Sequence, residues 1–288
     1  MPSKRKPARG ERRSRAAAGL VIVAIAVGIG YLALKPGHQL TPRVTGCEAG
    51  PSGDGLQLTP GQAAIAATIA GVASKRDMPP RAVAIAYATA LQESKLTNLH
   101  YGDLDSVGVF QQRPSEGWGT TKQIEDPVYA TGRFFSALAA VRGYLRLPIY
   151  KAAQSVQHSA DGSAYAQYAE MGTELASAFT GSQPRAVWCT YGSAPGKARL
   201  AAASRALSSA FGDLPRLASS DPAETIMVGK TQQGWAVASW LVSHAAGYGI
   251  TFVRYRGYQW LGFRGAGHWT KERAITRSRA APSAVVFG

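Results

Sequence analysis

The stretch from Ala16 to Leu34 limits the organisation of this chain more than any other feature. It reads AAAGLVIVAIAVGIGYLAL and holds no charged side chain over 19 positions. A helix of this length, at about 1.5 Å per residue, nearly spans a hydrocarbon core of roughly 30 Å. We therefore expect a single transmembrane anchor over residues 16–34. A cleaved signal peptide is the alternative, although Leu32 to Lys35 match a small-residue cleavage site poorly.

Basic residues are concentrated at the two ends of the chain. Residues 1–15 hold seven Lys or Arg and one Glu, as do residues 251–288, so each segment carries a net charge of +6. The formal net charge of +15 leaves only +3 for the residues between them, so we do not expect nucleic acid as a partner. Basic residues before the apolar stretch predict a cytoplasmic tail over 1–15 and an extracytoplasmic remainder, anchored as a single-pass protein in the cell membrane. The basic C-terminal segment suits anionic wall polymers.

The chain contains two cysteines, Cys47 and Cys189, and both lie on the predicted outer side. In an oxidising compartment an even pair favours a disulfide, which here would join the two ends of the central domain. Val44 to Cys47 also resemble a lipoprotein acylation box, but two prolines and an arginine separate that box from the apolar stretch. The disulfide is the expectation that we carry forward.

The order of turn and helix signals predicts the domain organisation. Residues 35–57 are rich in Pro, Gly and Ser and indicate a flexible linker. Thr59, Pro60 and Gln62 predict a helix start with a capping box. A second helix, over about 81–94, is apolar nearly all round and should be buried. A short β-like segment at 107–111 follows, and further helices are expected over about 126–144, 149–159, 163–179 and 196–211.

These segments predict a mainly α domain with a short β-hairpin over residues 58–182. A connector that contains a helix follows over 183–215. A small α+β domain over 216–288 would combine a helix at 234–246 with strands at 250–255, 258–263 and 283–287, because these runs are rich in β-branched and aromatic residues.

Glu93 is the carboxylate with the most suggestive surroundings. It ends the predicted buried helix and precedes a polar loop that contains Asp103, Asp105 and Gly108. Apolar surroundings favour the protonated form of a carboxylic acid, which is the form that can donate a proton to a glycosidic oxygen. A glutamate at a helix end is more commonly a solvated side chain, so the residues by themselves leave both roles open.

Glu93-Ser94, followed by Ser106-Val107-Gly108-Val109-Phe110-Gln111, resembles the signature of soluble lytic transglycosylases and goose-type lysozymes. The segment from Ala90 to Gly119 is also similar to transglycosylase-like domains of actinobacterial cell-wall proteins. The resemblance covers residues 59–180 and implies a lysozyme-like domain that cleaves the glycan strands of peptidoglycan. It implies Glu93 as the general acid/base and a substrate groove lined by Ser94, Ser106, Gly108, Gln111, Gln112 and Tyr165.

In that group the glutamate protonates the oxygen between N-acetylmuramic acid and N-acetylglucosamine, then removes a proton from the sugar's own C6 hydroxyl. A hydrolase would need a second carboxylate, roughly 6.5–9.5 Å away in the inverting case. Asp103 and Asp105 are the candidates, although turn formation is the simpler role for both. Tyr165 and Gln157 fall where the group has its third motif, usually Ala-Tyr-Asn, but the Asn is missing here. Trp118 is either a platform for a sugar ring or a residue that packs its own loop.

Metal chemistry is not expected. The five histidines show no paired spacing and no Cys-x-x-Cys occurs, so we predict neither a metal site nor a cofactor. Residues 234–255 and 283–287 faintly resemble zinc D-Ala-D-Ala carboxypeptidases. Gln233 and the run Ala284–Phe287 stand where that family has metal ligands, which implies a non-catalytic relative that binds peptidoglycan or a partner. The rival to catalysis in the whole chain is a silent wall-binding or scaffold protein.

Overall fold

The computed structural model describes residues 45–51, 54–159, 162–193, 196–217, 223–263, 267–272 and 281–288. All of them belong to one compact unit that begins at Arg43. The expected cytoplasmic tail (1–15), the expected anchor (16–34) and most of the expected linker lie outside the described residues. Within the described ranges, no helix is both long enough and apolar enough to cross a bilayer.

The fold mixes helices with two antiparallel sheets. The helical half begins as the sequence predicts: the Thr59 hydroxyl accepts a hydrogen bond from the amide of Gln62, and the capping box starts α2 (Pro60–Lys75). The second helix is α3 (Pro80–Ser94), and it is buried along most of its length, as its all-round apolar sequence predicts. The other helices of this half are η1 (Pro114–Glu116), α4 (Thr121–Ile124), α5 (Pro127–Ala140), α6 (Ile149–Gln157), η2 (Gly162–Tyr168) and α7 (Ala169–Phe179).

Two expected elements of this half differ in detail. The helix predicted over 163–179 is divided into the 3-10 helix η2 and the α-helix α7. The β-like segment at 107–111 forms no regular strand; it makes isolated bridges between Leu99 and Gly108 and between Val107 and Gln112. The two amides of Val107 and Gln112 each donate to the other residue's carbonyl at 3.1 Å, so the hairpin is reduced to a single closed turn.

The first sheet corrects the prediction of a flexible linker up to residue 57. It consists of β1 (Gly46–Ala49), β2 (Leu56–Leu58) and β3 (Val187–Thr190) in the order β2-β1-β3. Cys47 faces Cys189 across β1 and β3, and the expected disulfide between them is confirmed. These strands have only three or four residues each, which is too short for an alternating pattern to be detected in the sequence. Their pairing partners identify them as strands.

The second sheet holds the C-terminal part of the chain. Its strands are β4 (Arg216–Leu217), β5 (Glu224–Met227), β6 (Phe252–Tyr255), β7 (Tyr258–Leu261), β8 (Thr270–Lys271) and β9 (Ala284–Phe287), in the order β4-β5-β9-β6-β7-β8. The predicted strands β6, β7 and β9 are present, whereas β4, β5 and β8 were not expected. The remaining helices are α8 (Leu200–Phe211), α9 (Thr231–Ser243) and α10 (Ala245–Tyr248).

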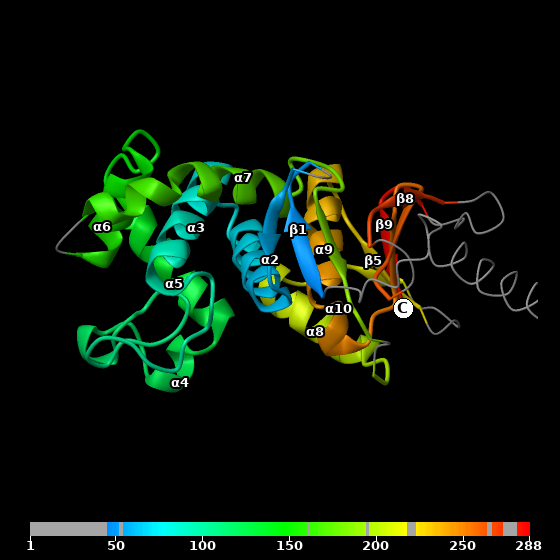
Figure 1. Cartoon of the computed structure of the whole chain (residues 1–288), viewed down its shortest axis with the longest axis horizontal. Helices are drawn as coiled ribbons and strands as arrows, with labels where there is room; N and C mark the ends of the chain where they lie inside the picture. Colours follow the sequence, from blue (N-terminus) through cyan, green and yellow to red (C-terminus); the bar gives the residue numbers. More distant parts are fainter. Residues whose placement is uncertain are drawn as a thin grey trace, which may run out of the picture. The chain divides into compact units, whose positions relative to one another are not determined.

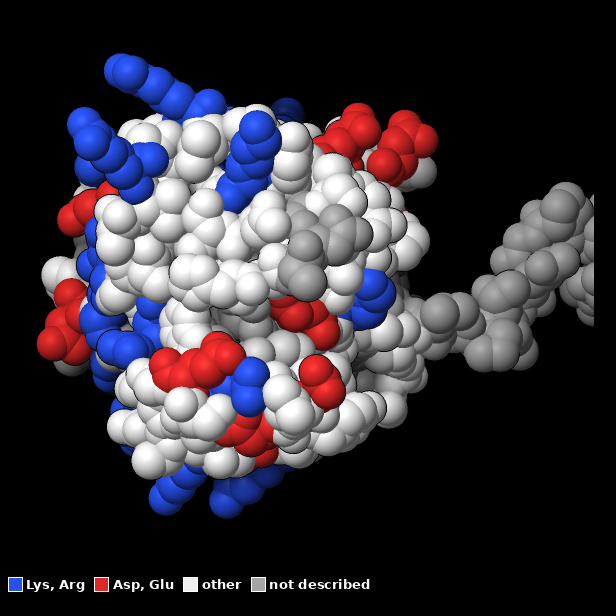
Figure 2. Space-filling model, turned by 90° about the vertical axis from the view of Figure 1, so that its left-hand side faces the viewer, with Lys and Arg blue, Asp and Glu red and all other residues white. Residues whose placement is uncertain are grey.

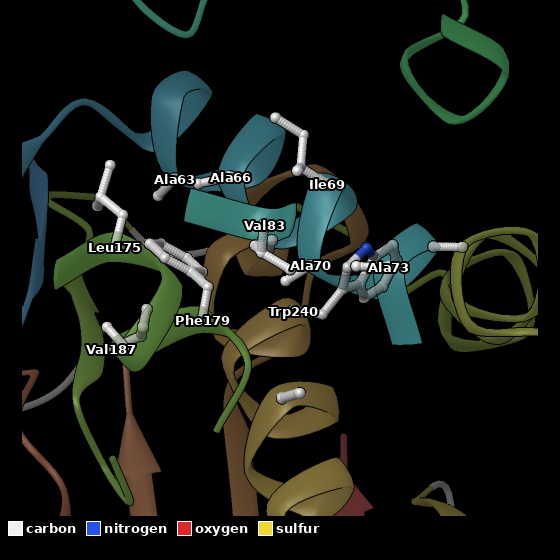
Figure 3. Packing of buried hydrophobic residues seen from close by; sticks show 14 of the residues in the cluster. Ala63, Ala66, Ile69, Ala70, Ala73, Val83, Leu175, Phe179, Val187 and Trp240 are labelled. Carbon is white, nitrogen blue, oxygen red and sulfur yellow. The ribbon is translucent and has the colours of Figure 1, made fainter. Parts of the chain in front are cut away.

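Helix α9 joins the two halves instead of belonging to a separate domain. One side of α9 packs on β6 and β9, and another packs along α2, as Figure 1 shows. Figure 3 shows the centre of this packing, where the small side chains Ala66, Ala70 and Ala73 of α2 face larger neighbours such as Phe179 and Trp240. Small residues let helix backbones approach closely. The predicted boundary between domains 58–182 and 216–288 is therefore bridged by a shared core.

Candidate active site

Glu93 lies in the last turn of α3, where this buried helix reaches the surface. Its side chain is half-buried. The helix ends abruptly because Lys95 and Leu96 both have left-handed backbone conformations, with φ of 55° and 57°. Leu96 is fully buried, so the chain turns back under Glu93 and fixes the carboxylate at the helix end.

Tyr165 of η2 holds the Glu93 carboxylate. Its hydroxyl donates a hydrogen bond of 2.6 Å to Glu93 Oε1, and its side chain is only 1% exposed. Burial raises the pKa of the Tyr165 phenol well above its usual range, and the bond to Glu93 raises it further, while the Ser159 hydroxyl acts in the opposite direction. The phenol is therefore a permanent donor near neutral pH. The sequence names Tyr165 only through the resemblance, since 72 residues separate the pair.

Ser94 and Gln157 hold the Val109–Phe110 segment against the end of α3 and α6. The buried Ser94 hydroxyl donates to the Val109 carbonyl at 2.7 Å, and Gln157 Nε2 donates to the next carbonyl, that of Phe110, at 2.8 Å. The Phe110 ring is buried and stacks on Phe134 with centroids 4.5 Å apart. Ser94 was expected to contact substrate, but its hydroxyl is occupied in joining α3 to this segment.

Three other expected groove residues are buried within the turn. Gly108 has a φ of +80°, and a Cβ there would come within 2.7 Å of the Ile124 carbonyl. Its glycine thus permits close approach of α4, not of a glycan. Ser106 is 7% exposed and Gln112 2% exposed, and the Gln112 amide donates to the Ala130 carbonyl. These residues shape the turn from inside.

Gln111 is the member of the glutamine pair that lies near the surface. Its side-chain amide donates to the carbonyls of Gly108 at 3.1 Å and Tyr101 at 3.3 Å. It has a left-handed backbone with φ of 47°. Gln111 therefore ties the loop around residue 101 to the turn.

The two candidate second carboxylates differ in their surroundings. Asp105 accepts hydrogen bonds from Arg113 Nε at 2.8 Å, from the Ser115 amide at 2.8 Å and from the Ser115 hydroxyl at 2.9 Å. The hydrogen bond from Arg113, followed by that from the Ser115 amide, lowers the pKa of Asp105 to about 2. Asp103 is exposed, and its carbonyl accepts from the Ser106 amide in a turn. Asp105 is thus an anchor of the loop.

Figure 2 views the end of the molecule where α3 to α6 lie, and this face is hollowed. Asp and Glu side chains gather around the hollow, and most Lys and Arg side chains lie toward the edges of the face. In the part of the chain that the structure describes, no group of three or more His, Cys, Asp or Glu is arranged to hold a metal ion.

The C-terminal residues that were compared with metal ligands have structural contacts. Gln233 Oε1 accepts a hydrogen bond from the Gly229 amide at the start of α9. The strand Ala284–Phe287 is buried on both faces. These positions contribute to the core that α9 and the second sheet share.

No protein-family model matches this chain, and no curated protein matches it significantly. The functional argument therefore depends on the geometry of the residues around Glu93.

Proposed function

We propose that this protein is a membrane-anchored, extracytoplasmic lytic transglycosylase that cleaves the bond between N-acetylmuramic acid and N-acetylglucosamine in peptidoglycan. One observation carries the proposal: a half-buried glutamate at a helix end is fixed by a buried tyrosine whose phenol remains protonated. This bond fixes the carboxylate relative to the buried core, as the action of a general acid requires.

The proposed reaction uses the two oxygens of Glu93 differently. Tyr165 occupies Oε1, and Oε2 has no hydrogen bond to any residue that the structure describes. Protonated Glu93 gives its proton to the glycosidic oxygen as the bond to C1 breaks, and the N-acetylglucosamine leaves as an alcohol. The resulting carboxylate then removes the proton from the C6 hydroxyl, whose oxygen bonds to C1. The product is a 1,6-anhydro sugar, and no water is consumed.

The surroundings of the aspartates favour this outcome over hydrolysis. An inverting hydrolase requires a carboxylate that activates water, roughly 6.5–9.5 Å from the acid. The Asp105 carboxylate accepts three hydrogen bonds from its own loop, and these bonds hold its pKa far below neutrality. Such a group is a weak base, and Asp103 is an exposed residue of a turn, so we assign both the acid and the base role to Glu93.

The location outside the cytoplasm is part of the same proposal. The confirmed disulfide between Cys47 and Cys189 fits an oxidising compartment, and the sequence of residues 16–34 fits an anchor. The basic C-terminal segment would favour anionic wall polymers near that surface.

Digestion of purified peptidoglycan by the full chain tests the proposal. We expect the wild-type protein to release soluble fragments and Glu93→Gln to release at least about a hundredfold less, because general acid–base catalysis supplies about 10²–10⁴ in rate. Glu174→Gln, the same change on the exposed face of α7, is the matched control and should retain full activity. Mass spectrometry should find products lighter by one water than hydrolysis products.

Two results would contradict the proposal. Equal release by the wild-type protein and Glu93→Gln would remove Glu93 from the chemistry. Retention of glycan binding with no release by either protein would favour the silent wall-binding rival.

A further inference from the structure

A pocket opens beside the loop that follows the turn at 107–112. It has a volume of about 650 Å³ and lies between η1, α5 and the C-terminal end of α6. Trp118, Arg133 and His158 line it, together with Glu116 and Ser136. A volume of this size falls within the range of pockets that bind small ligands.

The aromatic wall of this pocket is held in place before any ligand binds. Arg133 Nη2 donates to the Gly117 carbonyl at 3.0 Å, and the Tyr129 hydroxyl donates to the Trp118 carbonyl at 3.2 Å. The Trp118 side chain is half-buried and packs against the hydrophobic core. These bonds fix the backbone that carries Trp118, and a half-buried indole ring is the kind of surface on which a sugar ring stacks.

The charged side chains around the pocket differ in whether they form an ion pair. Glu116 pairs with Arg113 at 2.7 Å, and Arg113 also pairs with Asp105 at 2.8 Å. Arg133 has no ion pair with any carboxylate among the described residues, and its hydrogen bond leaves most of its donors exposed. His158 is likewise exposed at the C-terminal end of α6. The pocket therefore offers the guanidinium group of Arg133, which has no ion-pair partner among the described residues, beside an aromatic ring.

Residues next to Glu93 and next to His158 form hydrogen bonds to two neighbouring carbonyls of the chain. Ser94, the neighbour of Glu93, binds the Val109 carbonyl, and Gln157, the neighbour of His158, binds the Phe110 carbonyl. His158 in the wall of the pocket directly precedes Ser159, whose hydroxyl lowers the pKa of Tyr165, and Tyr165 in turn binds Glu93. The wall of the pocket is therefore continuous in the chain with the residues that hold Glu93.

We propose that this pocket is an anion-selective subsite, in which Trp118 receives a sugar ring and Arg133 binds the carboxylate carried by the muramic acid substituent. The inference rests on the proposed function because it assigns the substrate of the same groove. It adds a basis for discrimination: a glycan of N-acetylglucosamine alone, such as a chitin oligomer, has no carboxylate for Arg133.

Binding measurements in the Glu93→Gln background test the subsite without turnover. The two probes are a peptidoglycan oligosaccharide that carries its muramic acid carboxylates and a chitin oligomer of equal length, each titrated by calorimetry. We expect Arg133→Gln to weaken binding of the peptidoglycan probe about tenfold, because a hydrogen bond to a charged group is lost, and to leave chitin binding unchanged. Arg133→Lys should recover part of the loss, and Trp118→Phe should weaken both probes.

Arg142→Gln is the matched control, since it removes the same charge from an exposed arginine outside the pocket, and it should alter neither titration. Unchanged binding of the peptidoglycan probe to Arg133→Gln, or equal weakening of the binding of both probes, would overturn the subsite.

The measurements distinguish failure of the subsite from failure of the catalytic function. If cleavage depends on Glu93 but glycan binding is the same with and without Arg133, the subsite is wrong and the catalytic function stands. If binding is selective and depends on Arg133 but the wild-type protein does not cleave the glycan, the catalytic function is wrong and the subsite stands.

Discussion

At the scale of single residues, the candidate site depends on one pair of side chains. Tyr165 is buried and its raised pKa keeps the phenol protonated, so it donates to Glu93 whether that group is an acid or a carboxylate. A donor that strengthens its bond when Glu93 becomes negative also stabilises the carboxylate that follows proton transfer. Tyr165 is therefore a positioning residue that acts through Glu93.

Replacing Tyr165 by Phe removes the hydrogen bond and keeps the ring. We expect glycan release to fall about tenfold to a hundredfold, since hydrogen bonds to charged groups contribute about 1.5–3 kcal/mol. Initial rates of peptidoglycan solubilisation measure the effect. Tyr150→Phe on α6 should behave as wild type, and an undiminished rate in Tyr165→Phe would refute the role of the phenol.

The sequence predicted the residues of the site better than their roles. Tyr165 binds Glu93, a contact that the resemblance does not give, and Ser94, Ser106, Gly108 and Gln112 are buried within the turn and the helix end. A sequence motif records which residue types occur together. It does not distinguish a side chain that touches a ligand from one that shapes the loop behind it.

At the scale of elements, the site is the junction between the end of α3 and the turn at 107–112. Ser94 makes this junction with one hydroxyl, which donates to the Val109 carbonyl and accepts from the Thr97 amide at 3.2 Å. The hydroxyl is buried, so water cannot replace either bond. Among the side chains of α3, Ser94 is thus the one that fixes the turn to the helix end, and Gln157 of α6 holds the next carbonyl.

Ser94→Ala should lower the free energy of unfolding by about 1–3 kcal/mol, because the Val109 carbonyl loses a buried donor. Urea unfolding followed by circular dichroism measures the change. Ser155→Ala on α6 is the control, because its exposed hydroxyl bonds only to the Lys151 carbonyl one turn earlier. A stability equal to wild type would mean that the junction is held elsewhere.

Long helices were predictable because caps and apolar periodicity are local. Thr59 and Pro60 mark the start of α2, and the apolar sequence of α3 indicates its burial. The strands β1, β2, β4 and β8 span only two to four residues each, so they leave no period to detect. Their existence depends on partners that are distant in the sequence.

At the scale of the whole molecule, the described residues form one unit in which α9 is shared by both halves. Helices α2 and α9 are each buried on more than one side, but the sequence does not state that they face each other. Their packing crosses the boundary that the sequence suggests near residue 182. Two buried helices from distant segments complete one core.

Removing the disulfide tests how the first sheet contributes to this unit. The bond closes a loop with a sequence separation of 142 residues, and loss of such a cross-link costs about 2–5 kcal/mol. We expect Cys47→Ser with Cys189→Ser to unfold at a correspondingly lower urea concentration and to retain catalysis below its transition, because Glu93 and Tyr165 do not contact the bond. An unchanged urea midpoint would show that the bond adds no stability.

The Cys47–Cys189 bond also determines the path of a mechanical load. A tension applied between a point before residue 45 and a point after residue 189 passes directly through the sulfur bridge. Residues 48–188, which include Glu93, Tyr165 and the Trp118 pocket, carry none of that tension because they lie within the closed loop. The candidate site on a chain that is pulled from its ends would therefore keep its shape. After reduction, the same pull would act on the hydrogen bonds between β1 and β3.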